Sequence, residues 1–428
     1  MRSDIGNQPT GKYTYLHWDQ VRVRPPPTGY TSREWWAAIK LRRISSRHEL
    51  PFKDKSGVPF SFNDSGNLYR LLHEVDREAS GRIEVARADV VNPDQRERYM
   101  MNSLIEEAIA SSQLEGAVTT RRVAKEMLRS GRRPTDTSEQ MIVNNYAGME
   151  FLRANTREEL SVPMLLELQR ILTDGTLDDA NAVGRFRNES DAVHVVDRRD
   201  GRVVHTPPPA DELESRMKRL VEFANAHDED PFIHPVVKAI LLHFMIGYDH
   251  PFVDGNGRTA RALFYWSMAR SGYWLVEFLS ISTIIRRSPA QYVRAYVYSE
   301  TDDNDVTYFL VYNLRVISRA IQALHVYLTR KARESRDLEE TLRGGNLAHL
   351  LNHRQVALLS HVLKYPDTTY TIESHRRSHN VTYETARTDL IGLTKLGFVN
   401  VAKRGRKLVY RRHGDVEARI RSTATHMT

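Results

Sequence analysis

The chain has 428 residues, of which 40% are hydrophobic and 27% are charged. This is the composition of a soluble globular protein with enough apolar residues for two or three domains. We find no run of about 18 apolar residues and therefore expect no membrane span. The first residues, MRSDIGNQPTGKYTY, lack the apolar core of a secretory signal.

The chain contains no cysteine, which excludes disulfides and thiolate chemistry and fits a cytoplasmic protein. Its formal net charge is +8. A basic chain can attract nucleic acid or acidic partners, but here the excess is spread along the sequence, so the argument is weak by itself.

Residues 1–95 read as an N-terminal extension with aromatic and apolar anchors and one expected helix, Gly66–Ala79. A second helix is expected over Met100–Leu114, closed by Gly116 in the left-handed conformation. Glu115 then sits at a helix C-terminus, where an anion opposes the helix dipole. Either this carboxylate is stabilised by a partner outside its helix, or it is an ordinary solvated surface residue.

Two further bundle helices are expected around residues 138–155 and 162–175. Two β-branched runs follow, Val193–Val196 and Arg202–His205, and the turn Asp200-Gly201 between them predicts a β-hairpin. Such a hairpin beside helices is usually an exposed loop of the chain without a functional role.

The stretch from His250 to Arg261 reads HPFVDGNGRTAR and joins two apolar segments that are too long for strands. Its glycines allow positive φ angles, and the following helix start offers unpaired N–H groups, so the turn is a natural anion site. Two arginines near a helix start cost roughly 0.3–1 kcal/mol each against the dipole. That cost is understandable if they bind a polyanion.

Two other side chains in this stretch suit phosphate chemistry. Asp254 is an oxygen ligand of the kind that Mg²⁺ takes alongside phosphates, and His250 can act as a base near neutral pH. An EF-hand calcium loop is excluded, because it would need carboxylates or amides at positions 250 and 252 and a glutamate at 261, where this chain has His250, Phe252 and Arg261. A Walker P-loop is absent, and a zinc site from His234, His243 and His250 lacks the HExxH spacing. The remaining alternative is a capped turn with solvated arginines.

The helical pattern is interrupted at Asp302–Asp305. A charged connecting helix with a linker is expected over residues 331–346. Residues 347–413 show a helix, a helix–turn–helix and a hairpin, which is a winged-helix pattern; residues 414–428 read as a tail. The hairpin is basic, as phosphate contact requires, through Lys403, Arg404, Arg406, Lys407, Arg411 and Arg412. The second helix carries Glu384 and Asp389, so a protein-interaction module stays an equal alternative to a DNA partner.

The twelve residues from His250 match the H-x-F-x-[DE]-G-N-G-R-x-x-R signature, and the chain thereby resembles the Fic family. The resemblance implies a mainly α fold, with a Fic helical bundle and β-hairpin flap over residues 96–330 and a C-terminal winged-helix domain. It also implies a protein adenylyltransferase that moves AMP from ATP to a Ser, Thr or Tyr hydroxyl of a target protein or of itself. Gly257 stands where the kinase branch has lysine, which favours adenylylation.

The resemblance assigns roles to the motif residues in turn. His250 would deprotonate the target hydroxyl, Phe252 would anchor the loop, and Asp254 would hold Mg²⁺ on the α- and β-phosphates. The anion hole would be formed by Gly255, Asn256 and Gly257. Arg258 would contact the phosphates, and Arg261 the γ-phosphate.

The residues Ser111 to Gly116 fit the family's inhibitory pattern [ST]-x-x-x-E-[GN]. The resemblance implies that Glu115, on a helix over about residues 100–116, pairs with Arg261 and blocks the productive γ-phosphate pose. We expect a bidentate contact between the two. The hairpin would be the flap that holds the target segment by main-chain pairing.

Several alternatives stay open at this point. The chain could be a DNA-binding regulator whose Fic core only senses nucleotide, or a Fic enzyme that also removes AMP. A homodimer and the identity of the target protein are also left open by the sequence.

Overall fold

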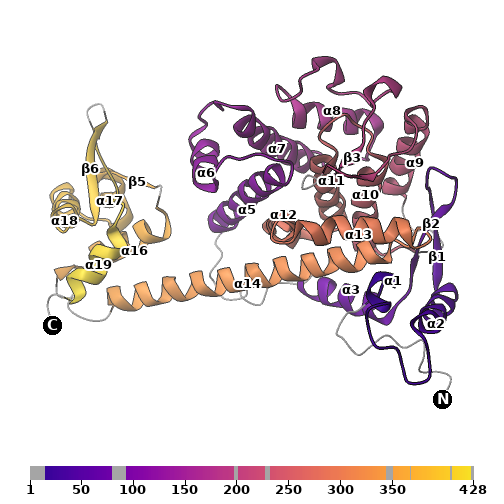
Figure 1. The fold of residues 1–428 in the computed structure, drawn as a ribbon. Coiled ribbons are helices and arrows are strands. Elements are labelled where there is room, and N and C mark those ends of the chain that lie inside the picture. The colour runs from indigo at the N-terminus through magenta and orange to yellow at the C-terminus, as the bar shows by residue number, and fades with distance from the viewer. Residues whose placement is uncertain are drawn as a thin grey trace. The chain divides into compact units, whose positions relative to one another are not determined.

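The computed structural model describes residues 15–79, 93–196, 201–226, 232–343, 350–366, 368–404 and 407–425. The chain divides into two compact units, Met1–His325 and Val326–Thr428, which are described separately below. The protein is mainly α-helical, as predicted, with small sheets (Figure 1). Within the described ranges, no helix has the length and apolar character needed to cross a membrane.

The first unit begins with two helices, a hairpin and a third helix. Their bounds are α1 (Trp18–Val21), α2 (Ser32–Ile44), β1 (Arg47–Lys53), β2 (Pro59–Asn63) and α3 (Gly66–Ala79). The helix predicted over Gly66–Ala79 is confirmed with the same bounds, whereas the antiparallel hairpin was not predicted. The buried Arg43 joins this segment to the later chain, donating to Asp302 Oδ2 at 3.3 Å and to the hydroxyl of Tyr308 at 2.7 Å.

A bundle of helices makes up the rest of the first unit. It contains α5 (Pro93–Leu114), α6 (Arg121–Ser130), α7 (Thr137–Ala154), α8 (Val162–Thr173), α9 (Leu213–Asn225), α10 (Pro235–Asp249), α11 (Asn256–Arg270), α12 (Ile281–Ile285), α13 (Pro289–Thr301) and the first part of α14 (Thr307–Arg343), which continues past His325 into the second unit. Four short 3-10 helices join them, η1 (Ala180–Ala182), η2 (Glu189–Asp191), η3 (Ala210–Glu212) and η4 (Trp274–Phe278). Twelve of the fifteen residues of α10 are buried, and so are twelve of α11. This pair is therefore the centre of the bundle (Figure 1).

The predicted flap hairpin is present but shorter than expected. Strand β3 (Val195–Val196) pairs antiparallel with β4 (Val203–His205), with Val195 opposite His205. Asp200 of the predicted turn lies outside the described residues, while Gly201 has a positive φ of 69°. The three prolines after β4 end the strand before η3, so the segment returns to the bundle at α9.

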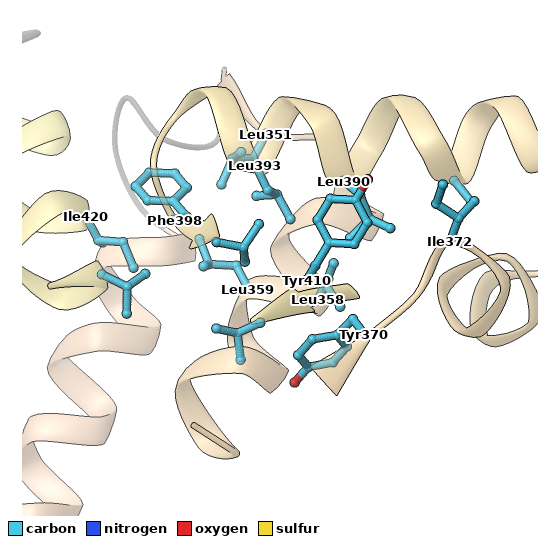
Figure 2. Packing of buried hydrophobic residues seen from close by; sticks show 14 residues of the cluster. Leu351, Leu358, Leu359, Tyr370, Ile372, Leu390, Leu393, Phe398, Tyr410 and Ile420 are labelled. Atoms are coloured by element: carbon cyan, nitrogen blue, oxygen red, sulfur yellow. The ribbon is translucent and has the colours of Figure 1, made fainter. Parts of the chain in front are cut away.

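The second unit is a small helical domain with a three-stranded sheet. Its elements after α14 are α16 (His353–Lys364), β5 (Thr369–Tyr370), α17 (Ile372–His379), α18 (Tyr383–Lys395), β6 (Val399–Arg404), β7 (Lys407–Arg412) and α19 (Val416–Thr425). The strand order is β5-β7-β6, all antiparallel. Figure 2 shows the core, where Leu359, Leu390, Leu393 and Phe398 are fully buried.

Two features of the second unit differ from the sequence reading. Residues expected to be a tail form α19, because Val416 and Ile420 are fully buried in the same core. Asp389 of α18 is only 2% exposed and points into the domain. Its charge therefore does not lie on the outer face of the helix. Arg406 of the predicted wing lies outside the described residues.

Candidate functional site

The junction between α10 and α11 is a tight loop that its own residues hold in shape. His250 caps α10 in the left-handed conformation, with φ 45°, and Gly255 caps the start of α11 with φ 87°. The side chain of Asn256 accepts a hydrogen bond from the Phe252 N–H at 2.9 Å and donates to the Phe252 carbonyl at 2.8 Å. Phe252 is fully buried and packs against Phe186. The loop is thus preformed, and Asn256 contributes its side chain to that shape.

His250 presents one ring nitrogen to the site. Its Nδ1 lies 3.2 Å from the carbonyl oxygen of Gly247, so a proton on Nδ1 leaves the Nε2 lone pair available. Burial is the main reason why the pKa of His250 is lowered to about 4. Nearby His205 also lowers it, whereas Glu115 raises it. The imidazole is therefore neutral at physiological pH and able to accept a proton.

Arg187 holds the backbone on which His250 sits, a role that the sequence reading missed. Its Nε donates to the His250 carbonyl at 2.8 Å, and its Nη2 donates to the carbonyls of Asp249 and Pro208 at 3.2 and 2.6 Å. The same side chain thus joins the left-handed residue at the end of α10 to the chain that follows the flap. The stretch GRFRN, with Arg185 and Arg187, gives no sequence signal for such a contact.

Arg258 is fully buried and both of its Nη groups are bound to protein. Nη1 donates to the carbonyl of Leu172 at 2.6 Å and Nη2 donates to Asp254 Oδ2 at 2.7 Å. The Asp254 carboxylate is 45% exposed, and its carbonyl accepts from Nε2 of the buried Gln169 at 3.3 Å. Arg258 and Gln169 therefore orient Asp254, and Gln169 was not among the predicted site residues.

Arg261 is a second buried cation of the site, and it donates hydrogen bonds to the end of α5 and to the turn that follows it. Nη2 donates to Glu115 Oε1 at 2.7 Å and to the Ser111 carbonyl at 3.2 Å, while Nε donates to Ser111 Oγ at 2.9 Å. Burial disfavours this charge, but Glu115, Tyr292 and Glu107 together outweigh that effect and the pKa of Arg261 is raised. The described contact with Glu115 runs through one oxygen; the bidentate form stays a prediction.

Gly257 leaves the space that Glu115 occupies. A Cβ at this position would overlap Glu115 Oε1 and would lie 3.0 Å from Arg261 Nη1. The carboxylate therefore rests directly on the first turn of α11, where backbone N–H groups and the helix dipole favour an anion. The side chain of Glu115 is 23% exposed, against 2% for Arg261. One partner of the pair can reach water and the other cannot.

The end of α5 is held in this place by α7. Asn145, 1% exposed, donates from Nδ2 to the carbonyl of Ala108 at 3.1 Å and to Ser112 Oγ at 3.4 Å. Ser112 Oγ in turn donates to the carbonyl of Met141 at 3.1 Å. Gly116 has φ 105° and ends the helix directly after Glu115. These contacts fix the turn that carries the carboxylate.

The three histidines weighed as a zinc site each have other partners. His243 is fully buried and its Nε2 lies 2.7 Å from the Tyr292 hydroxyl, while His234 Nε2 lies 3.0 Å from Asp76 Oδ2. Burial lowers the pKa of His243 to about 3, which makes it a neutral core residue. No group of three or more His, Asp or Glu side chains suited to a metal occurs among the residues described.

The arrangement combines the parts needed for chemistry on a phosphate. It offers a neutral imidazole, an exposed carboxylate, a helix start with glycines, and a buried guanidinium whose accessible partner is a carboxylate. A phosphate group and the Glu115 carboxylate would compete for the same donors.

Residues 159–268 match the model of the Fic/DOC family. This chain carries a Fic/DOC family domain. Curated relatives named protein adenylyltransferase Fic include one from Nematostella vectensis, 32% identical over 116 residues, and one from Drosophila virilis, 33% identical over 127 residues. These matches cover 27% and 29% of this chain and 24% of each relative. The chain therefore spans about a quarter of the length of these relatives.

A solved Fic family protein from Desulfovibrio desulfuricans G20 has a similar fold. The superposition has a TM-score of 0.51 at 20% sequence identity, and it covers 82% of this chain and 98% of that one. At this identity the likeness supports the Fic fold. Ser111 and Glu115 lie before the range that the family model matches.

Proposed function

We propose that the protein is an adenylyltransferase that transfers AMP from ATP to a Ser, Thr or Tyr hydroxyl of a target protein or of itself. The observation that carries the proposal is the neutral His250 beside a preformed anion site at the start of α11. The Fic/DOC domain and the adenylyltransferases of similar sequence support it.

In the proposed reaction, the target hydroxyl oxygen forms a bond to the α-phosphorus while the bond from that phosphorus to the oxygen bridging to the β-phosphate breaks. Diphosphate leaves, and the hydroxyl proton goes to Nε2 of His250. The N–H groups at Gly255, Asn256 and Gly257 stabilise the phosphate charge. Arg187 keeps His250 in place through its carbonyl, and Arg261 binds the γ-phosphate once Glu115 has left.

Magnesium fits the donor set at Asp254. This carboxylate is accessible and is oriented by Arg258, and a single protein carboxylate with phosphate and water oxygens is the usual environment of Mg²⁺. When bound, the ion would neutralise charge on the α- and β-phosphates.

Autoinhibition is the second part of the proposal. While Glu115 rests on Gly257 and pairs with Arg261, this arginine is not available to bind the γ-phosphate. ATP can then enter only in a pose with its α-phosphorus misplaced for attack. Ser111 holds Arg261 in either state, since it contacts Nε and the carboxylate contacts Nη2.

The experiment that tests the activity uses two labels. The full chain is incubated with Mg²⁺ and ATP labelled on the α-phosphate or, separately, on the γ-phosphate. We expect covalent label from the α-phosphate only, and an AMP adduct on a hydroxyl residue by mass spectrometry. Label from the γ-phosphate would indicate phosphorylation, and no label even from the Glu115→Gly variant would reject the proposal.

A DNA-binding role for the second unit is the second candidate, with the unit read as a winged helix. The inward position of Asp389 favours it, because the outer face of α18 then keeps Arg387 and Lys395 opposed only by Glu384. Lys403 and Arg411 on the hairpin are exposed. Binding of the full chain to duplex DNA should weaken as salt rises, and the salt slope should fall for Lys403→Gln with Arg411→Gln. Salt-independent binding would exclude phosphate contact.

A further inference from the structure

A cavity of about 40 Å³ lies among α5, α7, α11 and η4, beside the middle of α5. Most of its walls are apolar, and they include Met100, Leu104, Met149, Leu152, Tyr265 and Trp266. Glu107 also lines it, but this carboxylate already accepts hydrogen bonds from Ser280 Oγ at 2.8 Å and from the Ser282 N–H at 3.1 Å. The cavity therefore suits an apolar group.

This inner cavity meets a wider outer groove of about 780 Å³. Arg153, Thr156, Ala269 and Glu277 line both, so the two spaces adjoin one another. The outer groove is also lined by Arg157 and Arg270, which gives it three arginines against the single acidic side chain of Glu277. An apolar pocket thus has a mouth with net positive charge.

Two of these arginines have donors to spare. Nη1 of Arg270 donates to the carbonyls of Arg157 and Glu158 at 2.9 and 2.8 Å, and its guanidinium lies 5.6 Å from the centre of the Trp266 ring. Its Nε is buried without an acceptor, and within the described residues no acceptor faces Nη2. Arg157 is exposed and has no ion-pair partner in that part of the chain. Arg270 is held through Nη1 and the Trp266 ring, which leaves Nη2 for a ligand.

We propose that the two joined cavities bind a small carboxylate that carries an unbranched apolar chain. The chain enters between α5, α7 and α11, and the carboxylate pairs with Arg270 and Arg157. A water needs about 10–15 Å³ of such space, so the inner cavity accommodates about three chain carbons. The remaining carbons and the head group lie in the outer groove. This proposal is independent of the adenylyltransferase activity.

The test is a calorimetric titration of the full chain with butyrate, pentanoate and hexanoate. We expect affinity to rise by less than about fourfold with each methylene, because a fully buried methylene contributes about 0.8 kcal/mol and the carbons beyond the third lie in the outer groove. Arg270→Gln and Arg157→Gln should each weaken hexanoate binding about tenfold by removing a charged donor. Ala269→Leu should abolish the dependence on chain length, since the added side chain fills the junction of the two spaces.

Two comparisons make the test decisive. The exposed Arg287 lies outside both cavities, so Arg287→Gln should bind hexanoate as the unaltered chain does. Hexylamine should bind at least about tenfold more weakly than hexanoate, because its head group is a cation. Equal binding of hexylamine, no saturable binding of hexanoate, or full affinity in the Arg157→Gln variant would each overturn the proposal. The exposed Arg157 keeps the test valid if Arg270→Gln impairs folding.

Discussion

The pair Glu115–Arg261 in the first unit and the pair Arg354–Asp389 in the second are both ion pairs between a buried and a more accessible side chain, but they have opposite polarity. In the first, the buried partner is the cation, with 2% of its side chain exposed against 23% for Glu115. In the second, the buried partner is the anion, with 3% exposed against 20% for Arg354. Each pair joins a buried charge to a more accessible one from another helix.

The difference lies in what else holds the buried charge. Asp389 also accepts from Asn352 Nδ2 at 2.7 Å and lies 3.1 Å from His375 Nε2, so protein groups surround it. Arg261 lies at the first turn of α11, beside Gly257 and a motif that suits phosphate. Under the proposed function a ligand anion would replace Glu115, whereas no such motif lies beside Arg354. We expect the first pair to control activity and the second to control stability.

The largest effect should come from His250. In the Glu115→Gly background, His250→Ala should reduce AMP transfer by about 10²–10⁴-fold, because the proton acceptor is lost. Initial rates with labelled ATP measure this. The exposed His353 of the second unit gives the control, His353→Ala, which should leave the rate unchanged. Comparable loss in both variants would contradict the assignment.

Removing the accessible partner of the first pair should raise activity. Glu115→Gly should increase self-labelling by about 10- to 100-fold, since it ends one charged hydrogen bond that competes with the γ-phosphate. Glu106 lies on the same helix but pairs with Arg121 and Lys125, so Glu106→Gln is the matched control. Unchanged labelling in Glu115→Gly would show that the pair is structural, like the one in the second unit.

Arg187 should behave as a positioning residue. In the Glu115→Gly background, Arg187→Gln should lower kcat about tenfold with little change in KM for ATP, because the His250 backbone loses a charged hydrogen bond while the phosphate donors stay. Steady-state rates at varied ATP separate the two parameters. A change confined to KM would place Arg187 on the nucleotide instead.

A substitution in the Arg354–Asp389 pair should change the stability of the second unit but not AMP transfer. The hydrogen bonds from Arg354 and its neighbours outweigh burial and keep the pKa of Asp389 below its ordinary value. Its contribution is therefore present above that ordinary value and is lost as pH falls through the folded-state pKa. Asp389→Asn should destabilise the second unit by about 1–3 kcal/mol in urea unfolding at neutral pH. AMP transfer should not change, and a loss of transfer would indicate coupling between the units.

The smallest effect should be the response of the first site to pH. Because the pKa of His250 is lowered to about 4, the neutral base persists below the ordinary value and is lost only as pH falls through about 4. Between about pH 8 and pH 5.5, kcat/KM of the Glu115→Gly variant should change less than about twofold, whereas an ordinary histidine would cost about tenfold. Removing Glu115 also removes an influence that raises this pKa. A midpoint near 6.5 would contradict the buried setting of His250.

Much of the first site was readable because it is local in sequence. The glycines, His250 and both arginines fall within twelve residues, and the helices on either side are apolar enough to be recognised. Arg187 and Gln169 could not be found in this way. Each acts through backbone carbonyls or N–H groups of residues distant in the chain, and such contacts leave no pattern of spacing.

In the second unit, too, local sequence patterns predicted some features and missed others. Its helices and hairpin follow hydrophobic periodicity. The short strand β5 and the helix α19, in contrast, have no sequence pattern by which they could be predicted. Two residues are too few for a strand pattern. The buried Val416 and Ile420 of α19 lie in a stretch that is otherwise polar. The burial of the Asp389 side chain could not be predicted either. The periodicity of a helix indicates its faces but not the partners that neutralise a buried charge.

By itself the sequence determined that a glycine turn and a helix start lie between two buried helices, and it predicted an anion site there, since backbone geometry and the helix dipole depend on neighbouring residues alone. Only the tertiary structure decided that Glu115, 146 residues before Arg261, rests on that site. It also decided that Arg187 supports His250. Desolvation and hydrogen-bond geometry depend on which distant side chains fold together, and no local pattern specifies them.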